Sequence, residues 1–186
     1  MIGLLGGAFD PPHNGHIALA RAALDQLGLE RLEVLVVADP GHKRVEAPAV
    51  ARLRLAEAAF AGLPVQVTLD DHPRTVDLLR KQRWGADPLF LVGADQFCDF
   101  LTWKEPERVL ELARLGVATR PGYPRDRLDG VLQRLARPER VVFFEIPPVD
   151  ASSTEVRRRI SARAPVADLV PPAVARLIEE LGLYRR

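Results

Sequence analysis

The chain has 186 residues, of which 47% are hydrophobic, and a formal net charge of +1 at pH 7. This length suits a single domain whose core needs neither disulfides nor structural metals to hold it together. Because acidic and basic residues nearly balance, the composition argues against a protein that coats nucleic acid or a membrane surface.

The single cysteine, Cys98, cannot form an internal disulfide, so we expect a reducing compartment and a cytoplasmic location. Cys98 itself is expected to be a small buried apolar residue. The N-terminus has no basic segment of the kind that begins a signal peptide, and no apolar run approaches the ~18 residues of a membrane helix. We therefore expect no membrane partner.

The N-terminal part of the sequence predicts a strand, a loop, a helix and a second strand. Residues 2–5 are a short apolar run, consistent with a buried strand. A helix is expected from about Asn14 or Gly15 until Gly28, which is placed to end it. Residues 32–37 are apolar at nearly every position, as in a strand covered on both faces.

The loop between the first strand and this helix, residues 6–16, reads GGAFDPPHNGH and resembles a phosphate site. Adjacent glycines permit backbone conformations barred to other residues and let a ligand approach closely. The helix that follows is expected to aim its first N–H groups and positive dipole end at that ligand, with His13 and His16 beside it. A lone histidine is more often structural and a lone Gly-Gly is usually a turn, but their combination is more specific.

A polar loop over residues 38–47 follows the second strand and carries Asp39 and Lys43. Loops in this position are where open α/β sheets bind ligands. A solvated basic turn is an equally good interpretation of the same residues.

The next elements are a helix over 49–61, a strand over 65–68, a loop with Arg74, and a helix that Thr75 caps and that runs to residue 84. The apolar spacing of the first of these helices predicts four inward side chains, namely Leu53, Ala56, Ala59 and Phe60.

Residues 89–93 form another buried strand that ends in glycine, repeating the pattern of the first strand. Asp95 follows, either as a carboxylate that bonds ribose or adenine groups or as an ordinary N-cap. Trp103 ends the next segment and is expected to border a pocket, whereas the aromatic side chains before it belong to the core.

Beyond this segment the sequence predicts a helix over 108–115, a strand over 116–119, a rigid loop that presents Arg120, a helix over 128–136 and a strand over 141–146. A further helix then begins with hydroxyl residues at its cap and Arg157 in its first turn. This start is a second candidate anion site, with a simple Ser/Thr cap as the alternative.

Strands that alternate with helices predict one α/β domain over residues 1–186, with a doubly wound, parallel, Rossmann-like sheet. Its site is expected at the carboxyl ends of the strands. The Gly-Gly loop, the two histidines, the turn at Gly93 and the helix start with Arg157 would meet there. A nucleoside triphosphate fits this set, although the sequence has neither a P-loop nor a G-x-G-x-x-G signature.

These motifs resemble a known family. Gly-Gly-x-Phe-Asp-Pro followed by His13-x-Gly15-His16, with Ser-Ser-Thr-x-x-Arg over residues 152–157, resembles the nucleotidylyltransferase superfamily. The Gly-Ala-Asp turn at 93–95 followed by Trp103, the Arg-Pro-Gly-Tyr loop at 120–123 and the terminal Leu-Tyr are similar to bacterial nicotinate-mononucleotide adenylyltransferases. The resemblance implies that the partners are two substrates, ATP and nicotinate mononucleotide. They would react to give nicotinate adenine dinucleotide and pyrophosphate in NAD biosynthesis.

The resemblance also implies residue roles. Its catalytic residues would be His13, His16 and Arg157. ATP would contact Gly6, Gly7, Ala8, Phe9, Gly15, His16, Gly93, Asp95, Ser152, Ser153, Thr154 and Arg157. The mononucleotide would contact Asp39, Lys43, Arg74, Thr75, Trp103 and Arg120. Mg²⁺ would be carried by the ATP phosphates, with no metal ligand from protein side chains.

Three departures from the family pattern stand out. The family usually has Thr at the position of Ala8, a longer loop than residues 39–43, and Ser-Tyr-Thr in place of the Pro-Arg-Thr of residues 73–75. The last two fall on the acceptor side of the site, so they leave the ATP prediction unchanged and the acceptor open.

Rival interpretations follow from the same residues. The acceptor could instead be nicotinamide mononucleotide or phosphopantetheine. A class I aminoacyl-tRNA synthetase core also has a motif similar to residues 13–16, but the chain has no room for a tRNA-binding domain and no Lys-Met-Ser-Lys-Ser-like segment. A nucleotide-binding regulator would bind ATP without turnover. The oligomeric state, including a homo-oligomer, stays open.

Overall fold

The computed structural model describes residues 1–41, 44–81 and 84–185. Within them, six strands form one all-parallel sheet in the order β3-β2-β1-β4-β5-β6. The strands are β1 (Ile2–Gly7), β2 (Arg31–Val37), β3 (Val65–Asp70), β4 (Leu89–Gly93), β5 (Arg114–Thr119) and β6 (Val141–Glu145). The predicted α/β fold with a doubly wound parallel sheet is confirmed.

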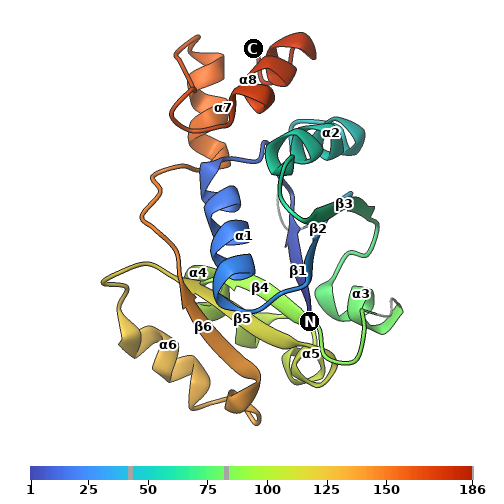
Figure 1. Ribbon diagram of the computed structural model, residues 1–186, viewed down its shortest axis with the longest axis vertical. Helices are drawn as coiled ribbons and strands as arrows, with labels where there is room; N and C mark the ends of the chain where they lie inside the picture. The colour runs from blue at the N-terminus through green and yellow to red at the C-terminus, as the bar shows by residue number, and fades with distance from the viewer. Residues whose placement is uncertain (42–43, 82–83, 186) are drawn as a thin grey trace.

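Helices cover both faces of the sheet (Figure 1). They are α1 (Asn14–Gln26), α2 (Ala49–Phe60), α3 (Thr75–Lys81), α4 (Ala94–Cys98), α5 (Pro106–Leu112), α6 (Arg125–Leu132), α7 (Ser153–Ser161) and α8 (Pro172–Glu180). One core cluster lies under α1, α2, α7 and α8, and a second lies under α3 to α6. In Figure 1, α7 and α8 lie at the same end of the molecule as α2.

The position of the site follows from the strand order. β1 lies between β2 and β4. The helix after β1 packs on one face of the sheet and the helix after β4 packs on the other. The chain therefore leaves these two neighbouring strands in opposite directions, which opens a crevice at their carboxyl ends.

Some element boundaries and inward positions differ from the sequence prediction. Residues 114–115, expected at the end of a helix, begin β5, because a short apolar run does not distinguish a buried strand from a helix. The helix α6 begins three residues earlier than predicted and ends at Leu132. Leu53 is only half-buried, and Leu55 and Arg52 are buried instead. Cys98 is also half-buried rather than buried.

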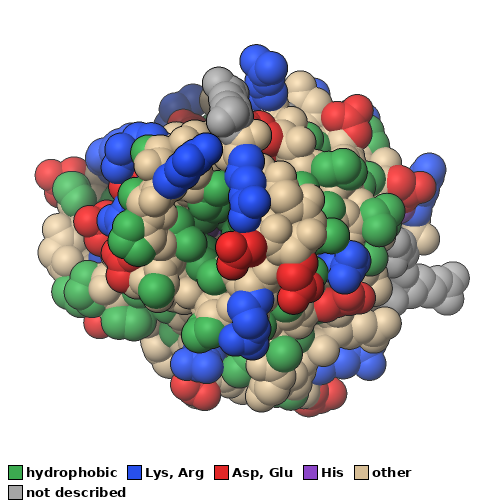
Figure 2. Space-filling view, turned by 90° about the horizontal axis from the view of Figure 1, so that it is seen from above, with side chains coloured by type: hydrophobic (Ala, Val, Ile, Leu, Met, Phe, Trp, Pro, Cys, Tyr) green, Lys and Arg blue, Asp and Glu red, His purple; other side chains and the backbone are tan. Residues whose placement is uncertain are grey.

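Acidic and basic side chains both occur over the face seen in Figure 2. Among the helices of the described residues, none is both long enough and apolar enough to cross a membrane.

Candidate functional site

The loop between β1 and α1 takes its shape from Phe9 rather than from the two glycines. Gly6 and Gly7 pair with β2 as strand residues, and the left-handed conformation falls on Phe9, with a φ of 49°. The expectation of unusual glycine conformations is therefore wrong. The left-handed conformation costs about 1–2 kcal/mol, and burial of the ring, which packs edge-on against His16 and Phe60, contributes stability of about the same size. A Cβ on Gly7 would lie 3.0 Å from this ring, so glycine permits the close approach.

The two histidines of the loop cap the start of α1 together. His13 is the N-cap residue, and its Nδ1 accepts a hydrogen bond from the Gly15 backbone N–H at 3.2 Å. The Nδ1 of His16 accepts from the His13 backbone N–H, also at 3.2 Å. A ring nitrogen that accepts carries no hydrogen, so in the neutral rings the hydrogen is on Nε2. The capping box thus fixes both histidines in the tautomer that has a donor at Nε2.

The first backbone N–H groups of α1 bond within the chain. The Asn14 N–H donates to the Leu169 carbonyl at 2.8 Å, the His16 N–H donates to the His13 carbonyl at 2.9 Å, and the Gly15 N–H is bound by the His13 ring. The expectation that these groups point at a ligand is therefore wrong. The histidine rings are the donors that this helix start offers. A Cβ on Gly15 would lie 3.0 Å from the His13 ring, which explains the glycine between the two histidines.

His13 is neutral at physiological pH. Burial, followed by the charge of Arg120, lowers the pKa of His13 from its ordinary 6.5 to about 4. The site therefore presents a neutral N–H donor at His13 rather than an imidazolium. Because the charge of Arg120 contributes to this lower pKa, Arg120 lies within electrostatic reach of His13. The resemblance had assigned Arg120 to the mononucleotide.

The shifted pKa of His13 predicts a pH dependence of stability. Between pH 4 and 6.5 the unfolded chain binds more protons than the folded chain, so the fold loses stability as the pH falls through this window. We expect this loss to reach roughly 1–2 kcal/mol at pH 5. A His13→Asn variant keeps an N-cap acceptor but does not titrate.

Urea unfolding of both proteins at pH 7 and pH 5 measures the effect. The free energy of unfolding of the wild type should fall more than that of His13→Asn. An equal fall would show that His13 is not the group responsible.

The start of α7 packs against the same loop. Ser152 is its N-cap residue, and the Ser152 hydroxyl accepts from the Glu155 backbone N–H at 3.2 Å. The Ser153 hydroxyl donates to the Pro11 carbonyl at 2.8 Å, and Thr154 is exposed. The Ser152 hydroxyl therefore caps the helix, as the cap interpretation predicted, and the Ser153 hydroxyl fixes the helix start against the loop.

Arg157, one turn into α7, reaches the same point. Its Nη1 donates to the Asp10 carbonyl at 2.7 Å, and its Nε pairs with the Glu46 carboxylate at 3.2 Å. The side chain is 20% exposed, so the guanidinium is held in place but reaches the surface. The structure thus brings the two predicted anion-binding segments together around residues 10–11.

Three buried polar residues, namely Asp10, Tyr184 and Arg52, hold this loop from behind. The Asp10 carboxylate, with the residue 3% exposed, accepts from the backbone N–H groups of Glu46 and Ala47 and from the Tyr184 hydroxyl at 2.7 Å. Burial, and then this hydrogen bond, raise the pKa of Tyr184. The third residue, Arg52, is 1% exposed. It occupies the buried face of α2, and a charged residue at an inward helical position is the sequence signal that would have identified it.

A cavity of about 810 Å³ opens beside the loop, at the carboxyl ends of β1, β2 and β3. It is lined by six of the predicted site residues, namely Gly6, Gly7, Ala8, Arg74, Thr75 and Trp103. The Trp103 indole packs edge-on against Phe90 and Phe100, which fixes its orientation in the wall. The cavity therefore joins the loop after β1 to an aromatic surface on which a planar ring can stack.

Other predicted residues lie off the cavity wall. Asp39 does not line it, although the neighbouring Pro40 does, and the Lys43 prediction falls outside the described residues. Gly93 is the N-cap of α4, so the interpretation of Asp95 as the N-cap is wrong. One oxygen of Asp95 accepts from the Tyr123 hydroxyl at 2.9 Å, which ties α4 to the loop after β5.

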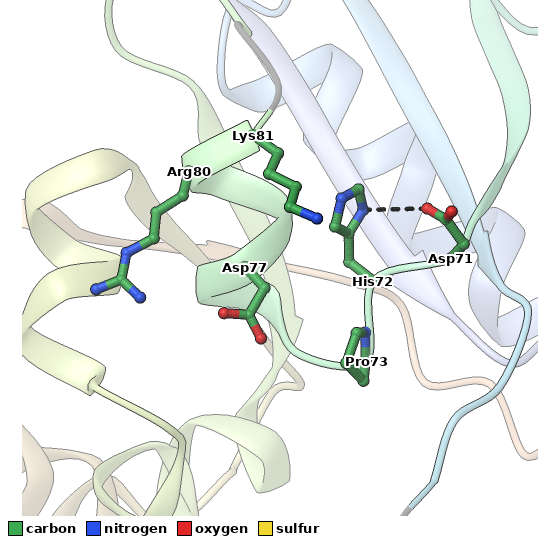
Figure 3. Close-up of a pocket in the computed structure, with 6 residues that line it drawn as sticks. All are labelled: Asp71, His72, Pro73, Asp77, Arg80 and Lys81. Carbon is green, nitrogen blue, oxygen red and sulfur yellow. Dashed lines mark ion pairs between the residues drawn. The ribbon is translucent and has the colours of Figure 1, made fainter.

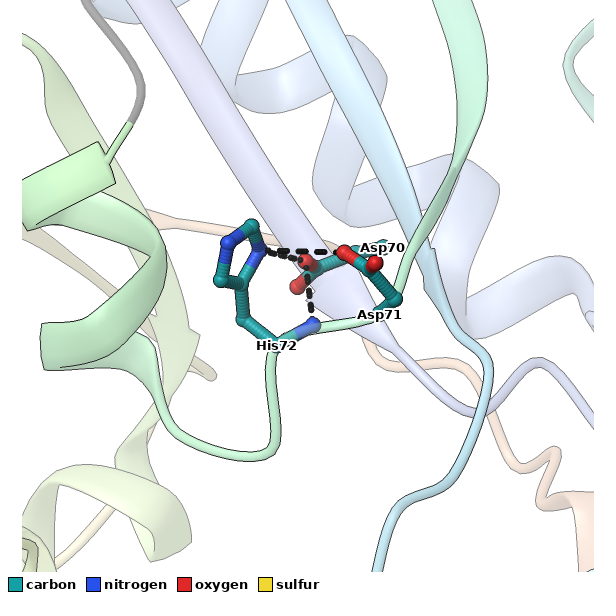
Figure 4. A group of neighbouring side chains, drawn as sticks. All are labelled: Asp70, Asp71 and His72. Carbon is teal, nitrogen blue, oxygen red and sulfur yellow. Dashed lines mark hydrogen bonds and ion pairs between the residues drawn. The ribbon is translucent and has the colours of Figure 1, made fainter.

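His72 also lines the cavity, and the sequence analysis gave it no role. Its Nδ1 and its backbone N–H both bond one oxygen of Asp70, at 2.7 and 3.0 Å, and Asp70 is 4% exposed (Figure 4). Together with Asp71, these residues offer one potential metal-ligand atom each within 4.8 Å. Because Asp70 already bonds the Nδ1 of His72, we interpret the pair as one that orients the imidazole.

A smaller cavity of about 370 Å³ lies on another side of His72. In Figure 3 the Lys81 ammonium group points toward the His72 ring, while Arg80 points away from it. Arg80 pairs with Glu105 and Lys104 pairs with Asp77. These salt bridges fix α3 to the segment before α5 and so hold one wall of the larger cavity.

Known proteins resemble this chain in sequence and in fold. Residues 4–159 match the cytidylyltransferase-like family. A Thermus thermophilus protein is 42% identical, with 99% of each chain covered, and a Rubrobacter xylanophilus protein is 37% identical, with 99% of this chain and 92% of the relative covered. Both are named "Probable nicotinate-nucleotide adenylyltransferase".

Among solved structures, a Plasmodium falciparum nicotinic acid mononucleotide adenylyltransferase complexed with APC has a TM-score of 0.78. It covers 98% of this chain and 96% of its own, and at 18% identity it supports the fold alone. The sequence relatives identify the family more closely than the structures do, because they match at 37–42% identity over nearly their whole length. This chain belongs to the nicotinate-nucleotide adenylyltransferases of the cytidylyltransferase-like family.

Proposed function

We propose that this enzyme transfers the adenylyl group of ATP to nicotinate mononucleotide, giving nicotinate adenine dinucleotide and pyrophosphate in NAD biosynthesis. The observation that carries the proposal is that the loop with His13 and His16, which Arg157 of α7 contacts, adjoins a cavity whose wall contains Trp103. Relatives named for this activity and a neighbour of the same fold complexed with NaAD support it.

The triphosphate is assigned to the side of the histidines and α7. His13 and His16, both with a hydrogen on Nε2, would donate to oxygens of the α- and β-phosphates. Arg157 would hold the β- and γ-phosphates, because a guanidinium gives short, charge-assisted hydrogen bonds to phosphate. The backbone of Gly6 and Gly7 would admit the nucleotide closely.

Mg²⁺ would arrive as part of the substrate. The buried carboxylate of this loop, that of Asp10, is already bonded to two backbone N–H groups and the Tyr184 hydroxyl, so it does not fit as a metal ligand. The proposed transfer therefore assigns the ion to the ATP phosphates.

The chemistry is a direct displacement. The 5′-phosphate of the acceptor attacks the α-phosphorus of ATP, the new P–O bond forms, and the bond to pyrophosphate breaks in line. The attacking phosphate is already ionised, so no general base and no covalent enzyme intermediate are needed. Catalysis then consists of alignment and of stabilising charge on the phosphates.

The acceptor is assigned to the cavity. Trp103 would stack on the pyridine ring, Thr75 would help to place backbone donors near the nicotinate carboxylate, and Arg74 would supply a positive charge. A carboxamide in place of the carboxylate would leave donors unpaired, at a cost of about 1–3 kcal/mol.

The function is tested by measuring pyrophosphate release and product mass with ATP and each of three acceptors: nicotinate mononucleotide, nicotinamide mononucleotide and phosphopantetheine. We expect the highest kcat/KM with nicotinate mononucleotide. A higher value with another acceptor would reassign the substrate, and ATP binding without turnover would favour the regulator.

Arg74 gives a sharper prediction about acceptor choice. Arg74→Ala is expected to reduce the ratio of kcat/KM for the acid over the amide acceptor several-fold, because an exposed cation contributes about 1 kcal/mol or less. Arg54→Ala is the matched control, since Arg54 is also exposed but lies on α2 and does not line the larger cavity. If Arg74→Ala leaves this ratio unchanged, Arg74 does not recognise the carboxylate.

A further inference from the structure

The guanidinium of Arg52 joins the ends of two neighbouring strands. All four of its hydrogen bonds go to backbone carbonyls. Its Nη1 donates to Ala8 and Val37, both at 2.7 Å, its Nη2 donates to Ala38 at 2.7 Å, and its Nε donates to Ala47 at 3.0 Å. One planar group from α2 therefore binds the loop after β1 and both ends of the loop after β2.

These carbonyls lie where the sheet opens. The pairing of β1 with β2 ends at Gly7 and Val36, and beyond this pair the two chains diverge into their loops. Arg52 supplies donors to Ala8 and Val37 just past the last pair, so it continues the hydrogen bonding between the strands after the ladder has ended. Arg52 thus gives these two half-buried carbonyls donors from within the protein.

A charge at this position is costly for the fold. Burial lowers the pKa of Arg52, and the charge of Asp10 opposes this shift. Neighbouring inward positions of α2, such as Leu55 and Phe60, are apolar and fully buried. A residue that breaks the apolar pattern of its helix at such a cost is typical of a functional site.

Asp10 reinforces the same junction from the loop after β1. Its carboxylate bonds the backbone N–H groups of Glu46 and Ala47, at the far end of the loop after β2. The carbonyl of Ala47 is in turn bound by Arg52. The loop that begins with Ala38 is thus fastened at both ends to the loop after β1.

We propose that Arg52 is a positioning residue of the adenylyl transfer, which fixes the loops after β1 and β2 to one rigid group and so holds ATP and the acceptor in line. The inference rests on the proposed function, which assigns the triphosphate to the loop after β1 and the acceptor to the cavity, whose wall includes Val37 and Pro40 at the end of β2 and in the loop after it. Direct displacement is sensitive to alignment, because a misplacement of about 1 Å costs on the order of 100-fold in rate.

The test compares Arg52→Lys and Arg52→Met with the wild type. Lysine keeps the charge but lacks the planar fork, whereas methionine removes every donor. We expect kcat per folded protein to fall about 10- to 100-fold in both variants, while the Kd for ATP measured without acceptor changes less than threefold. Arg140→Met is the matched control. Arg140 directly precedes β6, and its Nε donates to the Leu110 carbonyl of α5, away from the strand ends that form the cavity.

The outcomes separate positioning from a structural role. We expect Arg140→Met to have a lower melting temperature and the wild-type kcat per folded protein. If Arg52→Lys shows the same combination, the proposal is overturned. Arg52→Lys retains a buried cation and keeps the test open if Arg52→Met does not fold. Product formation by the wild type tests the proposed function separately, since the ratio of variant to wild-type kcat is measured with whichever acceptor the wild type uses.

Discussion

Replacing His16 by alanine is expected to lower kcat by at least about 100-fold and to leave the sheet and its helices intact. Loss of one preorganised donor to a transition-state oxygen typically costs about 10²–10³ in kcat. In the proposed reaction His16 is such a donor, because its Nδ1 accepts the His13 backbone N–H and its hydrogen is therefore on Nε2. The measurement is steady-state kcat with saturating ATP and acceptor, beside circular dichroism and melting of both proteins.

The glutamine variant separates the two duties of His16. Gln at the third helical position is a usual capping-box residue, so His16→Gln preserves an acceptor for the His13 N–H but removes the imidazole donor. We expect His16→Gln to melt close to the wild type and to remain as slow as His16→Ala. A wild-type rate in His16→Ala would refute any catalytic role, and recovery of the rate in His16→Gln alone would reduce the role of His16 to capping.

The fold was predictable because its signals are local and repeated. Apolar runs that end at Gly7 and Gly93, each followed by a helix, indicate parallel strands and place the site at the ends of β1 and β4. Boundaries were less predictable where one apolar pattern suits both helix and strand. Residues 114–115 were predicted as helix but form the start of β5. They pair with β4, and the local sequence does not show which residues will pair across a sheet.

It was predictable that two segments of the candidate site lie together, but their detailed geometry was not predictable. The sequence identified His13, His16 and Arg157 as neighbours, and the structure brings their segments together. It did not reveal that the histidines cap α1 for each other, because histidine is not among the usual capping residues. The sequence analysis also missed Arg52. Its inward position on α2 could have been recognised from the helical spacing, but its partners, four backbone carbonyls from three segments, have no sequence pattern.

Arg157→Ala is expected to raise the KM for ATP by about 10- to 100-fold and to lower kcat, because a charge-assisted hydrogen bond is worth about 1.5–3 kcal/mol. Arg158→Ala is the matched control, since Arg158 is the next residue on α7 but pairs with Glu155. The control should keep the wild-type KM. Steady-state kinetics over a range of ATP concentrations provide this comparison.

Comparing ATP with AMP assigns Arg157 to particular phosphates. AMP lacks the β- and γ-phosphates, so the proposed role predicts that Arg157→Ala weakens ATP binding and leaves AMP binding nearly unchanged. Inhibition by pyrophosphate should weaken in parallel with ATP binding, because pyrophosphate carries the same two phosphoryl groups. Arg157 also donates to the Asp10 carbonyl, and a general collapse of the loop would weaken AMP and ATP alike. Equal losses for both nucleotides would therefore show that Arg157 supports the loop rather than binding the leaving group.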